Sequence, residues 1–452
     1  MDYFDSRYLT LIGHVQSGKT NEEINYCYTS VNNYNVPVVF IVRNITADQL
    51  QLRSRFDTTA FGLNVKLLKN FTVETAVTFM ESLGIIILLC NETQLGKMKK
   101  IISKFDKPYN VCIDEVDFSI KSKDSVTQID NLLSFIKKKA NHILGATATP
   151  FALFSGDTSL SKIKKIKPNR GYHGIDSLDV KFVDSCIIRS EDDFPLCDMG
   201  AMDTIYEAFL EKPRGMILHT VVKERENHYR IQRYLVGVYP QMTVLTYNGD
   251  GIRVVCKERS DKPFADPKDV NNYGQLINKY HVNNEGVYVV HYFQNYSISE
   301  VLQILADDPE HDHTHISIVA GYLASRGISF VSSDYSLHLT DQYLYAAKSA
   351  HGENLLQSLR ILGCYNDNLP LTLWCSEKTW SCILNHNKII NNLVRGVNNS
   401  MNWMTKIKEV HINKPMSALT RPRLCNYSVK PEKKAFKLEI YRAPQSDDPE
   451  SE

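Results

Sequence analysis

The sequence predicts an α/β protein with two parallel sheets, each covered by helices on both faces. Short aliphatic runs, apolar along their whole length, alternate with stretches of roughly 15 to 25 residues of helical or mixed pattern. Strands that are apolar on both faces are typical of a parallel sheet buried between helices. The series begins again after residue 200, which indicates two units. The expected strands are Tyr8–Ile12, Val38–Val42, Ile85–Leu89, Val111–Ile113 and His142–Leu144, and then Gly215–His219, Met242–Thr246, Val287–His291, Ile316–Ala320, Ser336–Leu339 and Leu371–Trp374.

The two units divide the chain into four predicted parts. The first unit covers residues 1–155 and the second covers 200–376, with a linker at 156–199 and a small C-terminal extension at 377–452. Within the linker, the lysine-rich run 162–168 is interpreted as a solvated connection, with a phosphate-gripping surface as the alternative. The extension ends in an acidic stretch that we expect to be disordered.

Composition excludes several classes of protein. The 52 Lys and Arg residues nearly balance 51 Asp and Glu residues, so the net charge of +1 lacks the basic field of a protein that coats nucleic acid. Ten cysteines without a CxxC pair indicate a reducing compartment, and neither a disulfide framework nor a zinc ribbon. The most apolar run, 83–90, is too short to span a bilayer, and the first residues lack a signal-peptide pattern. We therefore expect a soluble intracellular protein, cytoplasmic or nuclear, with no membrane partner.

The strongest motif directly follows the first expected strand. Residues 13–20 read Gly-His-Val-Gln-Ser-Gly-Lys-Thr, a complete GxxxxGK[ST] pattern, and the residues after them can continue as a helix. In such a loop, glycines let backbone N–H groups curl around phosphates, the lysine neutralises phosphate charge, and the threonine hydroxyl takes one Mg²⁺ position. The expected nucleotide-binding residues are Gly13, Gln16, Ser17, Gly18, Lys19 and Thr20, with Lys19 also catalytic and Thr20 a metal ligand.

The second motif is a strand that ends in two carboxylates, at Asp114 and Glu115. Asp114 stands where an acid would hold Mg²⁺, and Glu115 stands where a base would orient and deprotonate the attacking water. An acidic loop after a buried strand is the alternative, and the preceding phosphate-binding pattern disfavours it.

The third motif, Gly145-Ala146-Thr147-Ala148-Thr149-Pro150, also follows an apolar strand. Small hydroxyl side chains at a strand end can hydrogen-bond the acidic pair and report the state of the γ-phosphate.

In order and spacing, the three motifs resemble those of superfamily 2 helicases, and they look most like the Z-one domain ATPases of bacteria, phages and large DNA viruses. Val15-Gln16-Ser17 and Pro150-Phe151-Ala152 are the most specific matches. The resemblance implies a P-loop NTPase of two RecA-like domains, with ATP and Mg²⁺ as cofactors and ATP bound between the domains.

The resemblance extends to two motifs of the second unit. Residues 321–328 contain a Ser-Arg-Gly that faces the nucleotide in the family, and residues 357–365 resemble the family's Gln-x-x-Arg-x-x-Gly-Tyr-Arg. In the family, the arginines of the latter motif stabilise the charge on the transferred phosphoryl group. The resemblance assigns nucleotide binding to Gly327 and Gln357, and the arginine-finger role to Arg360 and Arg326. The family's last arginine falls at Tyr365, so we expect one of these two arginines to suffice.

Weaker matches complete the pattern. Asp48-Gln49-Leu50 with Arg53 and Arg55 resembles a family motif that contacts nucleic acid, and Tyr172-His173-Gly174 resembles the family's linker.

Only 12 residues precede the phosphate-binding pattern, which leaves little room for an adenine-reading motif, so base selectivity is open. The run His311-Asp312-His313-Thr314-His315 is interpreted as a solvated loop, with a metal site as the alternative.

The sequence thus predicts an ATP-hydrolysing helicase or translocase that acts on nucleic acid, with DNA favoured over RNA. Protein partners in a replication, transcription or packaging complex are also expected, and the composition suggests a viral protein. The alternative is a nucleotide-gated assembly or structural ATPase with weak or no motor activity, which Tyr365 and the near-zero charge would favour. A simple P-loop kinase would leave the second unit without an explanation.

Overall fold

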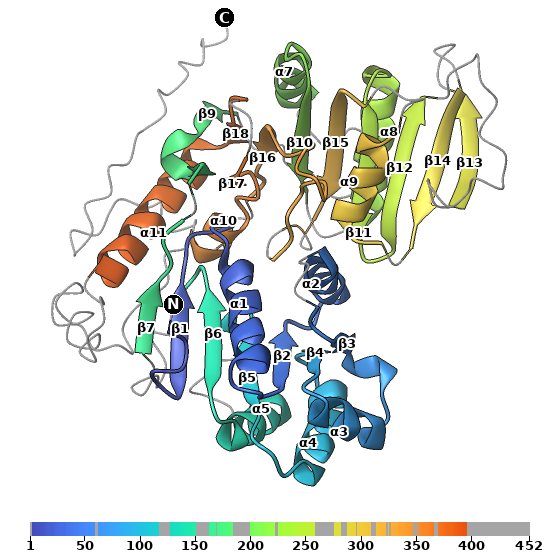
Figure 1. Ribbon diagram of the computed structural model, residues 1–452. Helices are drawn as coiled ribbons and strands as arrows, with labels where there is room; N and C mark the ends of the chain where they lie inside the picture. Colours follow the sequence, from blue (N-terminus) through green and yellow to red (C-terminus); the bar gives the residue numbers. More distant parts are fainter. Residues whose placement is uncertain are drawn as a thin grey trace, which may run out of the picture.

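The protein consists of two RecA-like α/β domains, which lie one above the other in Figure 1. The computed structural model describes residues 2–58, 62–116, 127–150, 162–168, 170–183, 199–221, 225–257, 275–281, 287–294, 296–308, 313–321, 324, 327–346, 350, 352–365 and 369–395. Both sheets have parallel strands at their centre, as the sequence predicts.

The first domain is a seven-stranded parallel sheet in the order β3-β4-β2-β5-β6-β1-β7. Its five expected strands are confirmed, and those at the centre are buried along their whole length because helices cover both faces. The strands are β1 (Tyr8–Ile12), β2 (Val38–Val42), β3 (Val65–Leu67), β4 (Ile85–Leu89), β5 (Asn110–Ile113), β6 (Ile143–Thr147) and β7 (Lys162–Lys165). Parallel order puts the ends of β1, β5 and β6 at one edge, where the three motifs begin.

Two apolar cores hold the helices of the first domain against its sheet. One core joins a sheet face to α1 (Lys19–Asn32) and α2 (Thr46–Thr58) through side chains such as Ile24 and Leu52. The other core joins the opposite face to α3 (Val73–Glu81), α4 (Glu92–Lys104) and α5 (Gln128–Lys139). Helix α4 begins where the Asn91 side chain accepts a hydrogen bond from the backbone N–H of Gln94, which satisfies one of the free donors of its first turn. A short 3₁₀ helix (Leu68–Asn70) follows β3.

The second domain is a nine-stranded mixed sheet in the order β13-β14-β12-β11-β15-β10-β16-β18-β9. Its strands are β9 (Asp179–Phe182), β10 (Gly215–Thr220), β11 (Thr243–Asn248), β12 (Gly251–Lys257), β13 (Gln275–His281), β14 (Val287–Phe293), β15 (His315–Ala320), β16 (Asp341–Tyr343) and β18 (Thr372–Cys375). Its helices are α7 (Met199–Leu210), α8 (Arg225–Val238), α9 (Ile298–Ala306), α10 (Gly352–Gln357) and α11 (Glu377–Arg395).

Two details of the second sheet differ from the sequence prediction. Strand β14 is antiparallel to its neighbours, because the short turn after β11 reverses the chain and starts an antiparallel extension through β12, β14 and β13. The strand expected at Ser336–Leu339 instead forms at β16, which buries Asp341 beside Lys212, with 2.6 Å between Oδ2 and Nζ. The prediction looked for runs of apolar residues, and a strand that contains a buried charged residue does not form such a run. The prediction therefore missed this strand.

The expected linker contributes an edge strand to each sheet. Strand β7 pairs with β1, and its Ile163 is buried while the flanking lysines are more exposed, so the lysine-rich run is largely an edge strand and not a solvated connection. Strand β9 pairs with β18, and the short β8 (Tyr172–His173) pairs with β17 (Gly363–Cys364). The connection is thus built into both domains.

Helix α11 belongs to the predicted C-terminal extension and packs on the second domain. Its Cys382, Ile383 and Ile389 are buried in the same core as α10. The rest of the extension, with the expected acidic tail, lies outside the described residues. Within the described part of the chain, no helix is both long and apolar enough to cross a membrane.

Candidate functional site

The loop between β1 and α1 has the form of a phosphate-binding loop. Gly18 has φ +95° and Gln16 has φ +54°, conformations that turn the backbone around the N-terminus of α1. The backbone N–H of Gly13 donates to the Thr147 carbonyl over 3.1 Å, which ties the start of the loop to β6. Free N–H groups at a helix N-terminus and the helix dipole both favour an anion at this place.

Two side chains of this loop fit a phosphate ligand. Lys19 is buried and its Nζ donates to the His14 carbonyl over 3.0 Å, so its positive charge is held inside the loop. The Ser17 hydroxyl is buried and has no hydrogen-bond partner in the part of the chain that the structure describes. A buried donor without a partner is costly in a folded protein, and a bound phosphate oxygen would satisfy it.

The acidic pair follows β5 at the same edge of the sheet. The backbone N–H of Asp114 donates to the Ile41 carbonyl over 3.1 Å, and Glu115 has φ +51°, which is unusual for a residue other than glycine. Burial, and then the charge of Glu115, raises the pKa of Asp114 to about 6, and Lys19 opposes this shift. A bound cation would stabilise the ionised carboxylate, so Asp114 fits Mg²⁺ together with Thr20, which lines the same cavity.

We predict that hydrolysis requires more Mg²⁺ as the pH falls below about 6. Because the pKa of Asp114 is raised to about 6, its carboxyl binds a proton below that pH, and Mg²⁺ must displace the proton. The Mg²⁺ concentration for half-maximal hydrolysis should rise about tenfold for each pH unit below the pKa. Mg²⁺ titrations between pH 5 and pH 8 would measure it, with the thermal midpoint at each pH as the control. A constant Mg²⁺ requirement down to pH 5 would exclude Asp114 as the ligand.

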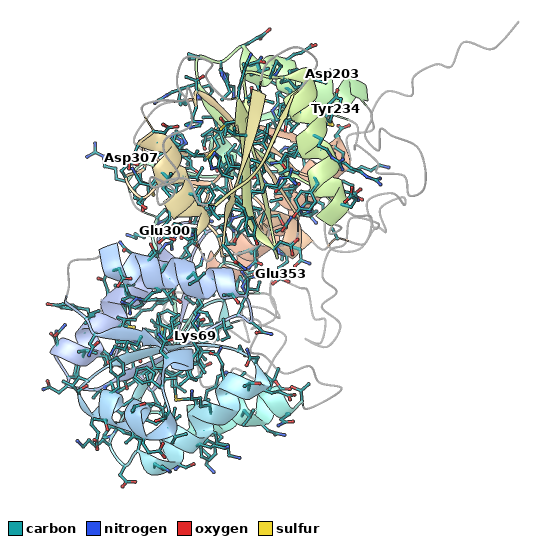
Figure 2. The ribbon with its side chains drawn as sticks, turned by 90° about the vertical axis from the view of Figure 1, so that its right-hand side faces the viewer. Lys69, Asp203, Tyr234, Glu300, Asp307 and Glu353 are labelled. Carbon is teal, nitrogen blue, oxygen red and sulfur yellow. The ribbon has the colours of Figure 1, made fainter. Side chains whose placement is uncertain are left out.

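The second domain reaches this edge through α10 and the turn after it. Gln357 Nε2 donates to Glu115 Oε2 over 3.1 Å and also to the hydroxyl of Thr149. Figure 2 shows α10 at the junction of the two domains, where Glu353 is labelled. The amide of Gln357 therefore links the acidic pair to the third motif.

Arg360 is buried against the phosphate-binding loop. Its Nη1 donates to the Gln357 carbonyl over 2.9 Å, whereas its Nε has no hydrogen-bond partner among the described residues. Gln16 Nε2 donates to the Arg360 carbonyl over 3.0 Å, so the loop also holds the backbone here. Burial lowers the pKa of Arg360 to about 10, which leaves the guanidinium protonated at neutral pH.

Tyr365 takes a different role from the arginine of the family motif. Its hydroxyl donates to the Ile361 carbonyl over 2.7 Å, and its ring stacks on His338 with 4.2 Å between centroids. Tyr365 lines the cavity, and its hydroxyl is committed to the backbone. Tyr365 therefore closes the wall of the cavity and brings no charge to it.

Helix α2 forms a second contact between the domains. Arg43, just after β2, pairs with Asp48 over 2.8 Å, and Gly327 of the second domain packs against this pair. Gly327 has φ +72°, and a Cβ there would lie 2.7 Å from Arg43 Nη2, so only glycine fits. Further along α2, Arg55 Nη2 donates to the Ser329 hydroxyl over 2.8 Å.

Both domains contribute to one cavity of about 260 Å³. The predicted site residues that line it are Gln16, Gly18, Lys19, Thr20, Asp114, Glu115, Gly327, Gln357 and Arg360. Gly13 instead lines an adjoining cavity of about 450 Å³, and Ser17 is a buried residue of the loop. Arg326 lies outside the described residues.

Several residues that line the cavity were not among the predicted nucleotide contacts. Arg55, Ser329 and Tyr335 are examples with polar side chains. For Arg55, the prediction was a nucleic-acid contact, and in the structure this residue lines the cavity and bonds Ser329. No local pattern identifies such residues, because their role depends on how the domains meet.

Among the described residues, no group of three or more His, Cys, Asp or Glu side chains could hold a metal ion. In the predicted histidine-rich loop, His313 is buried and lies 3.0 Å from Asp308 and 2.7 Å from the Thr243 hydroxyl. At this residue the expectation of a solvated loop was wrong, because two polar partners allow the imidazole to be buried. His311 and Asp312 lie outside the described residues.

No protein-family model and no curated protein matches the sequence. Similar solved structures include the DUF1998 helicase MrfA bound to DNA, with a TM-score of 0.48, 11% identity, and coverage of 85% of this chain and 49% of MrfA. MrfA bound to DNA and AMPPNP has a TM-score of 0.48 and 11% identity, with coverage of 85% and 48%. The Mycobacterium smegmatis helicase Lhr, bound to single-stranded DNA and AMP-PNP, has a TM-score of 0.49 and 10% identity, with coverage of 87% and 46%. This chain spans about half the length of these proteins, and their likeness to it assigns no function.

Proposed function

We propose that this protein is an ATP-dependent nucleic-acid helicase or translocase of superfamily 2, which hydrolyses ATP in the cavity between its two domains. The observation that carries the proposal is the hydrogen bond from Gln357 to Glu115, 3.1 Å long, inside a cavity that also contains Lys19 and Arg360. Each domain contributes charged groups to this cavity, so binding and loss of the γ-phosphate change the contact between the domains. A motor needs such a link between chemistry and movement.

Each residue has a role that its position supports. Lys19 and the N–H groups of the loop bind the β- and γ-phosphates. Thr20 and Asp114 would hold Mg²⁺, which neutralises charge on the phosphates when it is bound. Glu115 orients the attacking water and accepts its proton, and Arg360 stabilises the negative charge that develops on the γ-phosphoryl oxygens.

The nucleic-acid partner follows from the resemblance to the Z-one domain ATPases and other superfamily 2 helicases. The ordered motifs from Gly13 to Tyr365 support it, and we favour DNA over RNA. Protein partners in a replication, transcription or packaging complex, an intracellular location and a viral source belong to the same proposal.

A second candidate function is a nucleotide-gated assembly or structural ATPase. The observation that favours it is Tyr365, whose hydroxyl is bound to the backbone at the place of a family arginine. Such a protein would bind nucleotide, turn it over slowly or not at all, and form a stable complex with a partner protein.

The decisive experiment is ATP hydrolysis with and without single- and double-stranded DNA and RNA. We expect one of these nucleic acids to stimulate turnover, and Lys19→Ala to abolish both nucleotide binding and turnover. Nucleotide binding without turnover on any nucleic acid would exclude the motor and support the second candidate. Equal turnover by Lys19→Ala would mean that the activity is a contaminant.

A further inference from the structure

Helix α2 lies at the junction of the two domains and carries two arginines in different environments. Arg53 pairs with Asp57 one turn further along the helix, with 2.7 Å between Nη2 and Oδ1 and with both side chains partly exposed. Arg55 reaches across to the second domain, where its Nη2 lies 2.8 Å from the Ser329 hydroxyl. Of the two arginines, Arg55 alone lines the cavity that contains Lys19.

The guanidinium of Arg55 shares the cavity with the candidate catalytic groups Glu115 and Arg360. A nucleotide bound in this cavity would bring its phosphates close to the positive charge of Arg55. Nucleic-acid binding would place this side chain on an open surface, but Arg55 lines a cavity of about 260 Å³ between the domains.

The site also lacks one arginine that the family motif supplies. Tyr365 stands in that position and has no charge, and Arg360 already uses Nη1 for the Gln357 carbonyl. An ATP molecule brings several negative charges into this cavity, and a guanidinium has five donors in a planar fork that suits phosphate oxygens. The first domain can therefore supply a second arginine from α2.

We propose that Arg55 binds the terminal phosphates of the nucleotide and, through Ser329, links their presence to the closed arrangement of the two domains. This inference rests on the proposed function of the cavity. It makes Arg55 a nucleotide contact contributed by the first domain, in place of the arginine that Tyr365 replaces. Ser329 is a positioning residue, because it acts through the guanidinium of Arg55.

The test compares Arg55→Ala with Arg53→Ala, two arginine deletions on the same helix. For each full-length variant, calorimetry would measure the affinity for Mg²⁺ with AMP-PNP and with ADP, and fluorescence anisotropy would measure the affinity for single-stranded DNA without nucleotide. We expect Arg55→Ala to weaken AMP-PNP binding roughly ten- to a hundredfold, the range for a lost hydrogen bond to a charged group. ADP binding should weaken less. Arg53→Ala should leave the affinities for AMP-PNP and for ADP unchanged.

Two conservative variants separate a phosphate contact from a structural role. Arg55→Lys keeps the charge but not the fork, so it should recover part of the AMP-PNP affinity. Ser329→Ala should reduce the preference for AMP-PNP over ADP, and a change in fold alone would not alter that ratio. The thermal midpoint without nucleotide, measured on each variant, shows whether the fold is retained, and Arg55→Lys provides the test if Arg55→Ala does not fold.

The possible failures are distinguishable. If the wild type binds AMP-PNP and Arg55→Ala binds it equally well, the inference about Arg55 is wrong and the proposed function stands. If Arg55→Ala loses affinity for DNA and keeps its affinity for AMP-PNP, Arg55 is a nucleic-acid contact as its sequence motif suggests. If the wild type binds neither AMP-PNP nor ADP, the proposed function of the cavity fails, and the inference fails with it.

Discussion

Arg360→Ala is expected to lower the rate constant of ATP hydrolysis by about three to five powers of ten, the range measured for arginine fingers. The reason is that Arg360 is buried beside the phosphate-binding loop. Its Nη1 is fixed on the Gln357 carbonyl, and no described residue hydrogen-bonds its Nε. A guanidinium held in this way needs little rearrangement when charge develops on the γ-phosphoryl group. Single-turnover hydrolysis at saturating ATP would measure the effect.

Two controls define the role of Arg360. Arg360→Lys should be nearly as inactive as the alanine variant, because an ammonium cannot replace the planar fork. Arg233→Ala removes an arginine from the surface of α8, where it pairs with Glu226, and should hydrolyse ATP like the wild type. If Arg360→Ala retained full activity, another residue would be the finger. If the wild type were as slow as Arg360→Ala, the nucleotide-gated candidate would be favoured.

Glu115→Gln is expected to reduce hydrolysis by about two to four powers of ten, the usual contribution of a general base, while nucleotide binding is retained. The substitution keeps the shape of the side chain, and the amide oxygen of the new glutamine can still accept the hydrogen bond from Gln357 Nε2. The contact between the domains should therefore persist, and only the proton acceptor is lost.

A comparison of hydrolysis with AMP-PNP binding would separate these two effects. Glu115→Ala removes both the proton acceptor and the partner of Gln357, so it should also alter nucleotide affinity. Equal hydrolysis by Glu115→Gln and the wild type would exclude Glu115 as the base, whatever the affinities are.

The central strands of both sheets could be predicted because most of their residues are apolar. Val38–Val42 and Ile85–Leu89 are apolar on both faces, and only a sheet between two helical layers buries such runs. The loop that begins at Gly13 could also be predicted, because the types and spacing of its residues are those of a phosphate-binding loop.

Other elements could not be predicted because their stability depends on partners far away in the chain. Asp341 can be buried in β16 because Lys212 neutralises it, and Lys162 can lie in β7 because an edge strand has one side open to solvent. The contact between Arg55 and Ser329 spans 274 residues of sequence, so no local pattern indicates it. The sequence motifs thus included Gln357 and Arg360, which lie where the domains meet, but they did not indicate the contact between Arg55 and Ser329.

The position of the connection between the domains determines how they can move. Strand β7 attaches it to the edge of the first sheet and β9 to the edge of the second, and the Tyr172 hydroxyl between these strands donates to the Val15 carbonyl over 2.7 Å. A rotation of one domain relative to the other would have its axis close to this connection. In Figure 1, helix α2 lies above β4 and β3, away from β7. Because displacement grows with distance from the axis of a rotation, the contact of Arg55 with Ser329 would open further than the contacts of the phosphate-binding loop.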